Sequence, residues 1–127
     1  MRRGDLYLAD LDPSRGSEAR KTRPVILVSN DAANRAAQRG AAGVVTVVPI
    51  TSSTDRVFPF HVLLPGGTGT GLRVESKAQA EQVRAISVSR LMKGALGRVP
   101  DTQMAALDAA LRLHLALQSG APATLTG

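Results

Sequence analysis

The chain has 127 residues, of which 43% are hydrophobic, so it is long enough for one domain with a core and too short for two. It has no cysteine, which excludes disulfides and thiolate metal sites and favours an intracellular location. The two histidines, His61 and His114, are far apart, so a histidine-rich zinc site is not expected. No apolar run reaches the length of a signal peptide or a membrane span, and the sequence therefore predicts a cytoplasmic protein.

The formal net charge is +6, and arginine supplies most of the positive side chains. Guanidinium groups suit bidentate contacts to phosphate, so this charge favours an anionic partner. An arginine-rich composition can also reflect genomic base composition, so charge alone leaves nucleic-acid binding open. The aromatic residues are only Tyr7, Phe58 and Phe60, which argues against a surface built mainly from stacking platforms.

The first half of the chain predicts three strands. Residues 5–11 (DLYLADL) alternate apolar and polar positions and predict a strand that ends at the turn DPSRGS. Residues 24–31 (PVILVSND) and 43–52 (GVVTVVPITS) are rich in β-branched side chains, which is typical of strands buried on both faces. Residues 32–42 show no stable period, so a loop or a short helical turn is expected between these strands.

The middle of the chain is less regular. Residues 58–65 (FPFHVLLP) predict a fourth strand, bounded by prolines that suit strand ends. The glycine-rich stretch 66–71 predicts a turn, and we disfavour a phosphate cradle there because it lacks the Lys-Ser/Thr ending and no helical pattern follows. Residues 75–87 (ESKAQAEQVRAIS) are ambiguous, since their composition favours a helix while their alternation permits a strand.

Residues 101–118 predict a helix that opens after Pro100 with Asp101 as its cap. Its apolar residues form two stripes on a helical wheel. One stripe suits burial on the chain's own domain, and the second suits either a symmetry-related subunit or a single wide arc inside the monomer. Residues 1–118 should form one domain and residues 119–127 a flexible tail. The first stripe is Met104, Leu107, Leu111 and Leu115, and the second is Ala106, Ala110, Leu113 and Leu117.

Four segments share their residues and their order with a known family. They are RGDLYLADLDPSRGSEARKTRPVILVSND, VVPITSS, FPFHVLL and EQVRAIS, and they cover most of residues 3–90. The Gly-Asp opening strand, the Gly-Ser-Glu turn, the Arg-Pro-Val strand entry and the Pro-x-Thr-Ser step are specific only in combination. Together they resemble the MazF/PemK family of toxin endoribonucleases.

This resemblance implies a mainly β fold with a C-terminal helix (α+β), namely a small SH3-like open β-barrel of the MazF/CcdB type that forms a homodimer. It also implies that residues 75–87 are a strand, against their helix propensity. Ala78 and Ala80 depart from the pattern, because family members usually carry larger apolar residues at these positions.

The implied function is that of the toxin in a toxin–antitoxin system. Such a protein is a sequence-specific, metal-independent endoribonuclease that needs no cofactor and cleaves single-stranded RNA, messenger RNA included. The implied partners are the RNA, a second copy of the chain, and a cognate MazE-like antitoxin whose disordered acidic tail folds along the RNA groove. No membrane partner is expected.

The charged segment before the second predicted strand contains Arg23, a candidate for contact with phosphate. Pro24 biases Arg23 toward an extended backbone, so its guanidinium should be delivered from a defined place beside a rigid strand. An arginine fork suits the non-bridging oxygens of a phosphodiester and the charge that they gain in the transition state. By the family match, Arg23 and Thr51 are the catalytic pair. The structural alternatives are a surface ion pair of Arg23 with Glu18 or Asp31 and a strand-end turn at Thr51.

RNA carries its own nucleophile, the 2′-hydroxyl, and attack by it would leave a 2′,3′-cyclic phosphate and a 5′-hydroxyl. A guanidinium is a poor base because its pKa is above about 12. We therefore assign charge stabilisation to Arg23 and give Glu18, in the Gly-Ser-Glu turn, the task of positioning or deprotonating the 2′-hydroxyl. The predicted RNA-binding residues are Ser17, Arg20, Lys21, Gln82 and Arg84.

Two histidines and two alternative functions remain to be assigned. His61 is expected to be a polar edge-strand residue, and His114 is expected to be structural. The gyrase-inhibiting CcdB toxins share the barrel fold but rely on a C-terminal Trp, and this chain has none. A non-catalytic nucleic-acid-binding barrel would also use the positive charge, but it would never cut.

Overall fold

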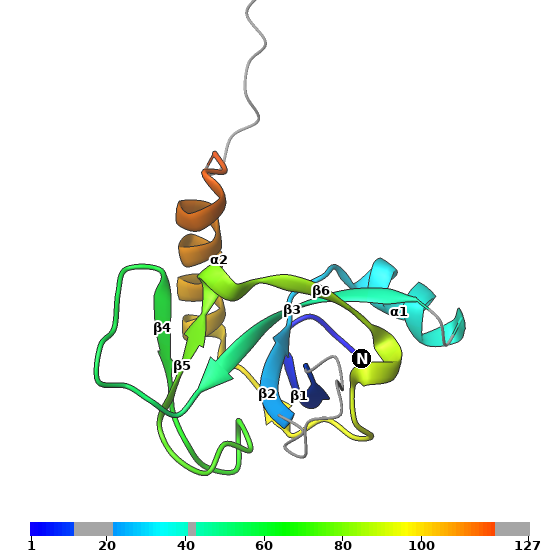
Figure 1. The fold of residues 1–127 in the computed structure, drawn as a ribbon, viewed down its shortest axis with the longest axis horizontal. Helices are drawn as coiled ribbons and strands as arrows, with labels where there is room; N and C mark the ends of the chain where they lie inside the picture. Colours follow the sequence, from blue (N-terminus) through cyan, green and yellow to red (C-terminus); the bar gives the residue numbers. More distant parts are fainter. Residues whose placement is uncertain (12–21, 41–42, 119–127) are drawn as a thin grey trace, which may run out of the picture.

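The computed structural model describes residues 1–11, 22–40 and 43–118. Seven strands, two helices and two short 3-10 turns make up these segments (Figure 1). In chain order they are β1 (Asp5–Asp10), β2 (Thr22–Leu27), α1 (Asp31–Gly40), β3 (Val44–Thr51), β4 (His61–Leu64), β5 (Ser76–Gln79), η1 (Ala80–Gln82), β6 (Arg84–Ser87), η2 (Val88–Arg90), β7 (Gly97–Arg98) and α2 (Asp101–Leu115).

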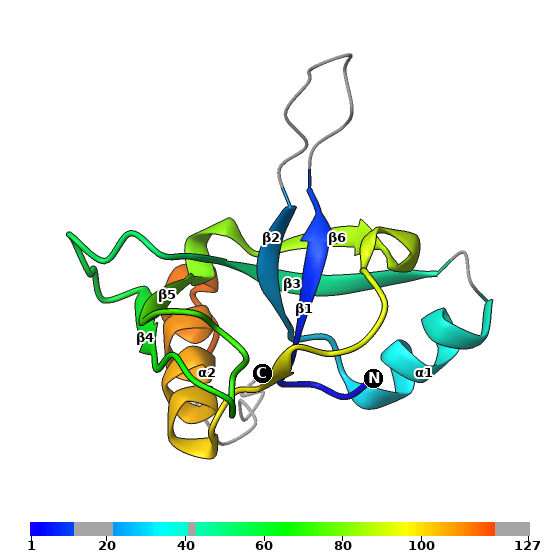
Figure 2. The same cartoon turned by 90° about the horizontal axis from the view of Figure 1, so that it is seen from below.

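The strands form one antiparallel sheet in the order β4-β5-β3-β2-β1-β7, and β6 also pairs with β3. The long strand β3 connects the two parts of this sheet. Its first half pairs with β6 and its middle with β2, whereas its end pairs with β5. The sheet therefore curls into a half-barrel with α2 beside β4 and β5, as the two views show (Figures 1 and 2). The expected mainly β fold with a C-terminal helix is confirmed.

Two clusters of buried residues lie on opposite faces of the sheet, because successive side chains of a strand alternate between its faces. Ile26 and Val48 join the cluster that includes Leu107 of α2. Val25 and Leu27 join the second cluster, which includes Ala37 of α1. Three consecutive residues of β2 are thus fully buried, which confirms the expectation of a strand covered on both faces.

Tyr7 belongs to the second cluster. Burial raises the pKa of its phenol above the usual value of 10.0, and the nearby carboxylate of Asp5 raises it further. Asp5 itself accepts a hydrogen bond from Nη1 of Arg98 at 2.7 Å, an ion pair that connects β1 to β7.

The prediction of a loop or short turn over residues 32–42 is wrong, because Asp31–Gly40 form a helix of ten residues. Only Asn34 and Ala37 of this helix are buried, so the sequence has no stripe of large apolar residues to indicate it. Asn34 donates through Nδ2 to the carbonyl of Ser29 at 2.8 Å. At the start of the helix, Oδ1 of Asn30 accepts from the amide of Ala33 at 2.8 Å. In this helix, local hydrogen bonds therefore take the place of packing by large apolar side chains.

Residues 75–87 form strands, as the family resemblance implies, and the helix that composition favours is absent there. The strand is interrupted, since β5 and β6 are separated by the 3-10 turn η1. Ala78 pairs with Ile50 on one side and Val62 on the other, and Ala78 and Ala80 are fully buried in the first cluster. Sheet pairing and burial outweigh helix propensity here.

Helix α2 begins at Asp101, and Pro100 occupies the N-cap position without a side-chain cap, so the assignment of Asp101 as the cap is wrong by one residue. The helix ends at Leu115, where Ala116 adopts a left-handed backbone with φ of 56°. The first stripe is buried at Leu107 and Leu111, although Leu115 is 47% exposed. The second stripe is mostly open to solvent, with Ala110 buried and Leu113 and Leu117 exposed.

The glycine-rich stretch 66–71 is a packing turn. Gly71 has φ of +76°, and a Cβ at this position would lie 2.2 Å from the carbonyl oxygen of Leu96, so a side chain cannot fit. Thr70 is buried and donates through Oγ1 to the carbonyl of Pro65 at 2.7 Å.

The predicted turn at residues 12–17 and the predicted tail at 119–127 lie outside the described residues, so the division at residue 118 stays a prediction. In the ranges that the structure covers, no helix has the length and apolar character needed to span a membrane.

Candidate functional site

Arg23 and Thr51 lie together at the ends of two neighbouring strands. The β2–β3 register ends with Val25 opposite Pro49, two residues before Arg23 on one strand and two residues short of Thr51 on the other. Both residues line the same pocket of about 650 Å³. Residues that are distant in sequence are thus brought to one site by strand pairing.

Arg23 is half-buried and its backbone is fixed by pairing with Ala9 of β1. The alternative ion pair with Asp31 is not among the ion pairs of the described residues, and Oδ1 of Asp31 accepts from the amide of Arg3 at 2.7 Å. None of the ion pairs among the described residues includes Arg23. The guanidinium therefore has donors to offer to an anion in the pocket.

Thr51 keeps a free donor. Its Oγ1 accepts from the amide of Ser53 at 3.2 Å, which is the turn arrangement of a strand-end threonine. This bond uses a lone pair and holds the hydroxyl in place while leaving its proton available. The turn role and a role toward a ligand are compatible.

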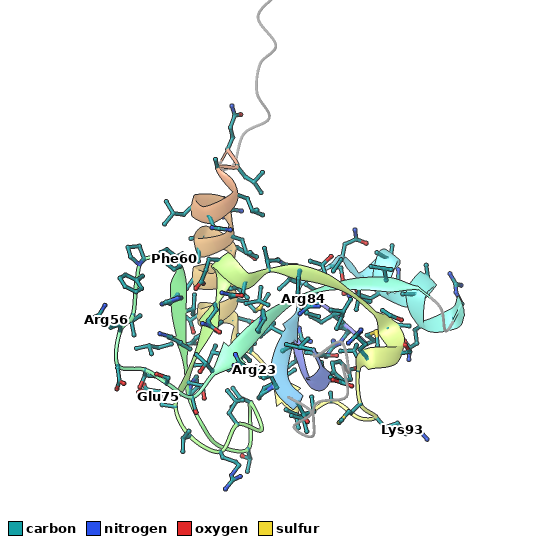
Figure 3. All side chains as sticks on the ribbon, in the orientation of Figure 1. Arg23, Arg56, Phe60, Glu75, Arg84 and Lys93 are labelled. Atoms are coloured by element: carbon teal, nitrogen blue, oxygen red, sulfur yellow. The ribbon has the colours of Figure 1, made fainter. Side chains whose placement is uncertain are left out.

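Arg84 and Gln82 lie farther along the same region. Arg84 pairs with Val47 across the β3–β6 ladder, and Val47 is four residues from Thr51, so Arg84, Val47 and Thr51 share one face of the sheet. Figure 3 shows Arg23 and Arg84 projecting from the central part of the sheet. Gln82 is exposed on η1, the turn just before Arg84.

Four predicted site residues, Ser17, Glu18, Arg20 and Lys21, lie outside the described residues. The described residues next to them in the chain are Leu11 and Thr22. The carbonyl of Leu11 accepts from Nη1 of Arg84 at 3.4 Å, and Thr22 lines the same pocket as Arg23.

The structure adds Arg73 to the site, because it lines the pocket with Arg23 and Thr51. The sequence does not indicate it, since Arg73 lies beyond the glycine-rich stretch 66–71 and in none of the four family segments. No described carboxylate pairs with Arg73, so the pocket presents two guanidinium groups together with the hydroxyls of Thr22, Thr51, Ser52 and Ser76. This set of donors suits the oxygens of a phosphodiester.

The side chain of His61 is more buried than expected for a polar residue on an edge strand. Its side chain is almost fully buried, and Nε2 lies 3.1 Å from Oε2 of Glu81. Nδ1 accepts from the amide of Phe58 at 3.1 Å, so in the neutral ring the proton is on Nε2 and is donated to Glu81. The partners lie on β4 and η1, and no local motif signals their contact. His114, expected to be structural, is exposed on α2.

Lys77 is also buried, in the middle of the three-stranded part of the sheet, where it pairs with Thr51 and Leu63. Its ammonium donates to the carbonyl of Arg56 at 2.5 Å and so fixes the loop between β3 and β4. Among the described residues, no three His, Cys, Asp or Glu side chains lie close enough together to hold a metal ion.

Comparisons with known proteins agree with this geometry. Residues 2–115 match the family described as the PemK-like, MazF-like toxin of type II toxin–antitoxin systems. The chain is 55% identical over 119 residues to Endoribonuclease MazF9 of Mycobacterium tuberculosis, which covers 94% of this chain and 99% of that one.

Two solved structures share the fold. An endoribonuclease in complex with its cognate antitoxin, from a mycobacterial species, superposes with a TM-score of 0.71 at 26% identity and covers 94% of this chain and 99% of that one. The M. tuberculosis toxin MazF-mt6 superposes with a TM-score of 0.69 at 25% identity over 90% of this chain and 98% of that one. Since the family match spans residues 2–115, this chain belongs to the PemK-like, MazF-like toxins of type II toxin–antitoxin systems.

Proposed function

We propose that this toxin is a sequence-specific endoribonuclease that cleaves single-stranded RNA, messenger RNA included, without a metal ion or cofactor. The observation that carries the proposal is that Arg23 and Thr51 line the same pocket. The 55% identity to Endoribonuclease MazF9 supports the same activity. The family membership and the absence of Trp disfavour a gyrase-inhibiting role.

The reaction uses the nucleophile that RNA contains. The 2′-hydroxyl loses its proton and its oxygen attacks the adjacent phosphorus, while the bond from phosphorus to the 5′-oxygen breaks and that oxygen takes up a proton. The products are a 2′,3′-cyclic phosphate and a 5′-hydroxyl end. Arg23 donates to the non-bridging oxygens as they gain charge, and Thr51 donates its hydroxyl to the same phosphate.

Glu18 is the proposed base that positions or deprotonates the 2′-hydroxyl. Replacing Glu18 with Gln keeps the size of the side chain and removes its basicity, so single-turnover cleavage should fall at every pH where the carboxylate is ionised. The pH profile of the variant should also lose its acidic limb. Near-normal single-turnover rates across the pH range would remove Glu18 from the mechanism.

The remaining predicted residues bind the RNA on either side of the cleaved bond. Arg20, Lys21 and Arg84 would contact phosphates, and Ser17 and Gln82 would contact bases or sugars. The same groove would accept the disordered acidic tail of a MazE-like antitoxin, which the charge of +6 favours. Localisation in the cytoplasm follows from these partners.

A homodimer is the proposed assembly. Leu113 and Leu117 of the second α2 stripe are 59% and 57% exposed, which leaves an apolar helix face that a second copy would cover. Light scattering at micromolar protein should therefore give twice the mass of the 13.3 kDa chain. A monomeric mass at this concentration would contradict the dimer.

The test of the proposed function is cleavage of a long single-stranded RNA in EDTA by antitoxin-free protein. Discrete fragments with cyclic phosphate ends are expected. Once a site is mapped, a matched oligonucleotide with a single 2′-deoxy nucleotide at that position should bind but remain whole. Cleavage of the deoxy substrate would contradict attack by the 2′-hydroxyl, and the absence of cleavage on varied RNAs would point to a non-catalytic binding barrel.

A further inference from the structure

The loop between β3 and β4 carries two of the three aromatic residues of the chain. The rings of Phe58 and Phe60 are stacked, with centroids 5.4 Å apart and an interplanar angle of 12°. Phe58 is the outer ring and is 45% exposed, whereas Phe60 is half-buried and contacts the His61 ring edge-on with centroids 4.6 Å apart. The pair thus forms a small aromatic surface with one ring open to solvent.

This surface is held in place by polar contacts on both sides. The amide of Phe58 donates to Nδ1 of His61, and the amide of His61 donates to the carbonyl of Phe58 at 2.8 Å. Lys77 holds the carbonyl of Arg56, two residues before Phe58. An exposed phenylalanine that is fixed in this way presents a preorganised flat surface, which lowers the entropic cost of binding a flat ligand.

Polar groups that suit a nucleotide flank the aromatic pair. The carbonyl of Phe60 accepts from the amide of Ala80 at 3.3 Å, and Glu81 contacts His61, so the first two residues of η1 lie beside Phe60 and His61, and the exposed Gln82 follows them in the chain. On the other side, Arg56 is exposed, and none of the ion pairs in the described part of the chain includes it. Figure 3 shows Arg56 and Phe60 along the same loop, away from Arg23.

We propose that the Phe58 ring is a stacking platform for one RNA base at a position that flanks the cleaved phosphodiester. This inference rests on the proposed endoribonuclease function. Arg56 contacts a phosphate of the flanking nucleotides, and Gln82 reads the edge of the stacked base. The platform connects to the cleavage site through Lys77, which pairs with Thr51 and holds Arg56. A base bound there would fix how the strand is placed across the Arg23 and Thr51 pocket and would contribute to sequence preference.

The chain has no Trp, so a Phe58→Trp variant carries a single fluorescent reporter on the platform. A Gln38→Trp variant, at an exposed position of α1, is the matched control. The ligand is the RNA with a 2′-deoxy nucleotide at the cleaved position. Saturable quenching is expected for Phe58→Trp and not for Gln38→Trp. Equal or absent quenching in both variants, at RNA concentrations that saturate wild type, would overturn the platform.

Kinetics supply a second test. Phe58→Leu should raise KM for the RNA roughly 10- to 100-fold and leave kcat nearly unchanged, whereas Phe58→Tyr, which keeps the ring, should behave as wild type. An abasic nucleotide can be placed at each position of the substrate in turn. At one flanking position it should raise KM for wild type, and at that position it should have no further effect on KM for Phe58→Leu.

These outcomes separate the two proposals. If wild type does not cleave RNA, the proposed function itself fails. If wild type cleaves and Phe58→Leu retains its KM and its base preference, only the platform is wrong. A changed mass of Phe58→Leu in light scattering would show that the ring contacts protein instead of RNA, and this would also overturn the platform.

Discussion

Replacing Arg23 with Ala is expected to lower the single-turnover rate of RNA cleavage by about 100- to 1,000-fold or more, because the pocket loses a preorganised donor to the phosphate as it gains charge. Arg23 makes no ion pair within the described residues, so its removal should change the free energy of unfolding by less than about 0.5 kcal/mol. The loss should therefore appear in the chemical step and not in the folded fraction. Circular dichroism and light scattering of the variant are the controls for the fold.

Arg23→Lys is the matched variant, since it keeps the charge and removes the bidentate fork. We expect activity between those of wild type and Arg23→Ala. Thr51→Ala should also slow cleavage, whereas Thr51→Ser keeps the donor and should retain most of the rate. Because both side chains would act on one phosphate, the double variant should lose less than the product of the single losses. An Arg23→Ala enzyme with more than a tenth of the wild-type rate would contradict the assignment.

Much of the fold can be predicted from alternation and composition. The β-branched runs predict β2 and β3, because burial on both faces requires apolar residues at consecutive positions. Helix α1 cannot be predicted in this way, since its contacts with the sheet use Asn34 and Ala37 instead of large apolar side chains. Residues 75–87 mislead for a related reason, because strand pairing with β3 and β4 outweighs a helix-forming composition.

The site is predicted only in part. Arg23 and Thr51 are indicated by their motifs, and the pairing of β2 with β3 brings their strand ends to one pocket. Arg73 reaches the same pocket from a distant loop, and His61 of β4 contacts Glu81 of η1, so neither contact follows from local spacing. The stacking of Phe58 on Phe60 depends on the backbone of a loop. A motif thus indicates single residues, whereas long-range strand pairing and loop conformation decide which residues lie together in the site.

Leu107 connects the C-terminal helix to this site through the core. It is fully buried in the cluster that also contains Ile50 and Leu72, and both of those residues line the pocket with Arg23 and Thr51. Leu107→Ala would leave a cavity in this cluster and remove the apolar contacts of the lost atoms. We expect the free energy of unfolding to fall by about 3 kcal/mol, within the range of roughly 2 to 5 kcal/mol for buried leucines.

Leu115→Ala is the matched control, because it makes the same change on the same helix where the side chain is 47% exposed. This substitution should lower the free energy of unfolding by less than about 1 kcal/mol. Urea unfolding at one fixed protein concentration measures both, and the slope of the transition should match that of wild type. On heating, Leu107→Ala should lose RNA cleavage at a lower temperature than Leu115→Ala, since the pocket depends on the core beneath it. Equal costs for the two substitutions would mean that α2 does not support the sheet through Leu107.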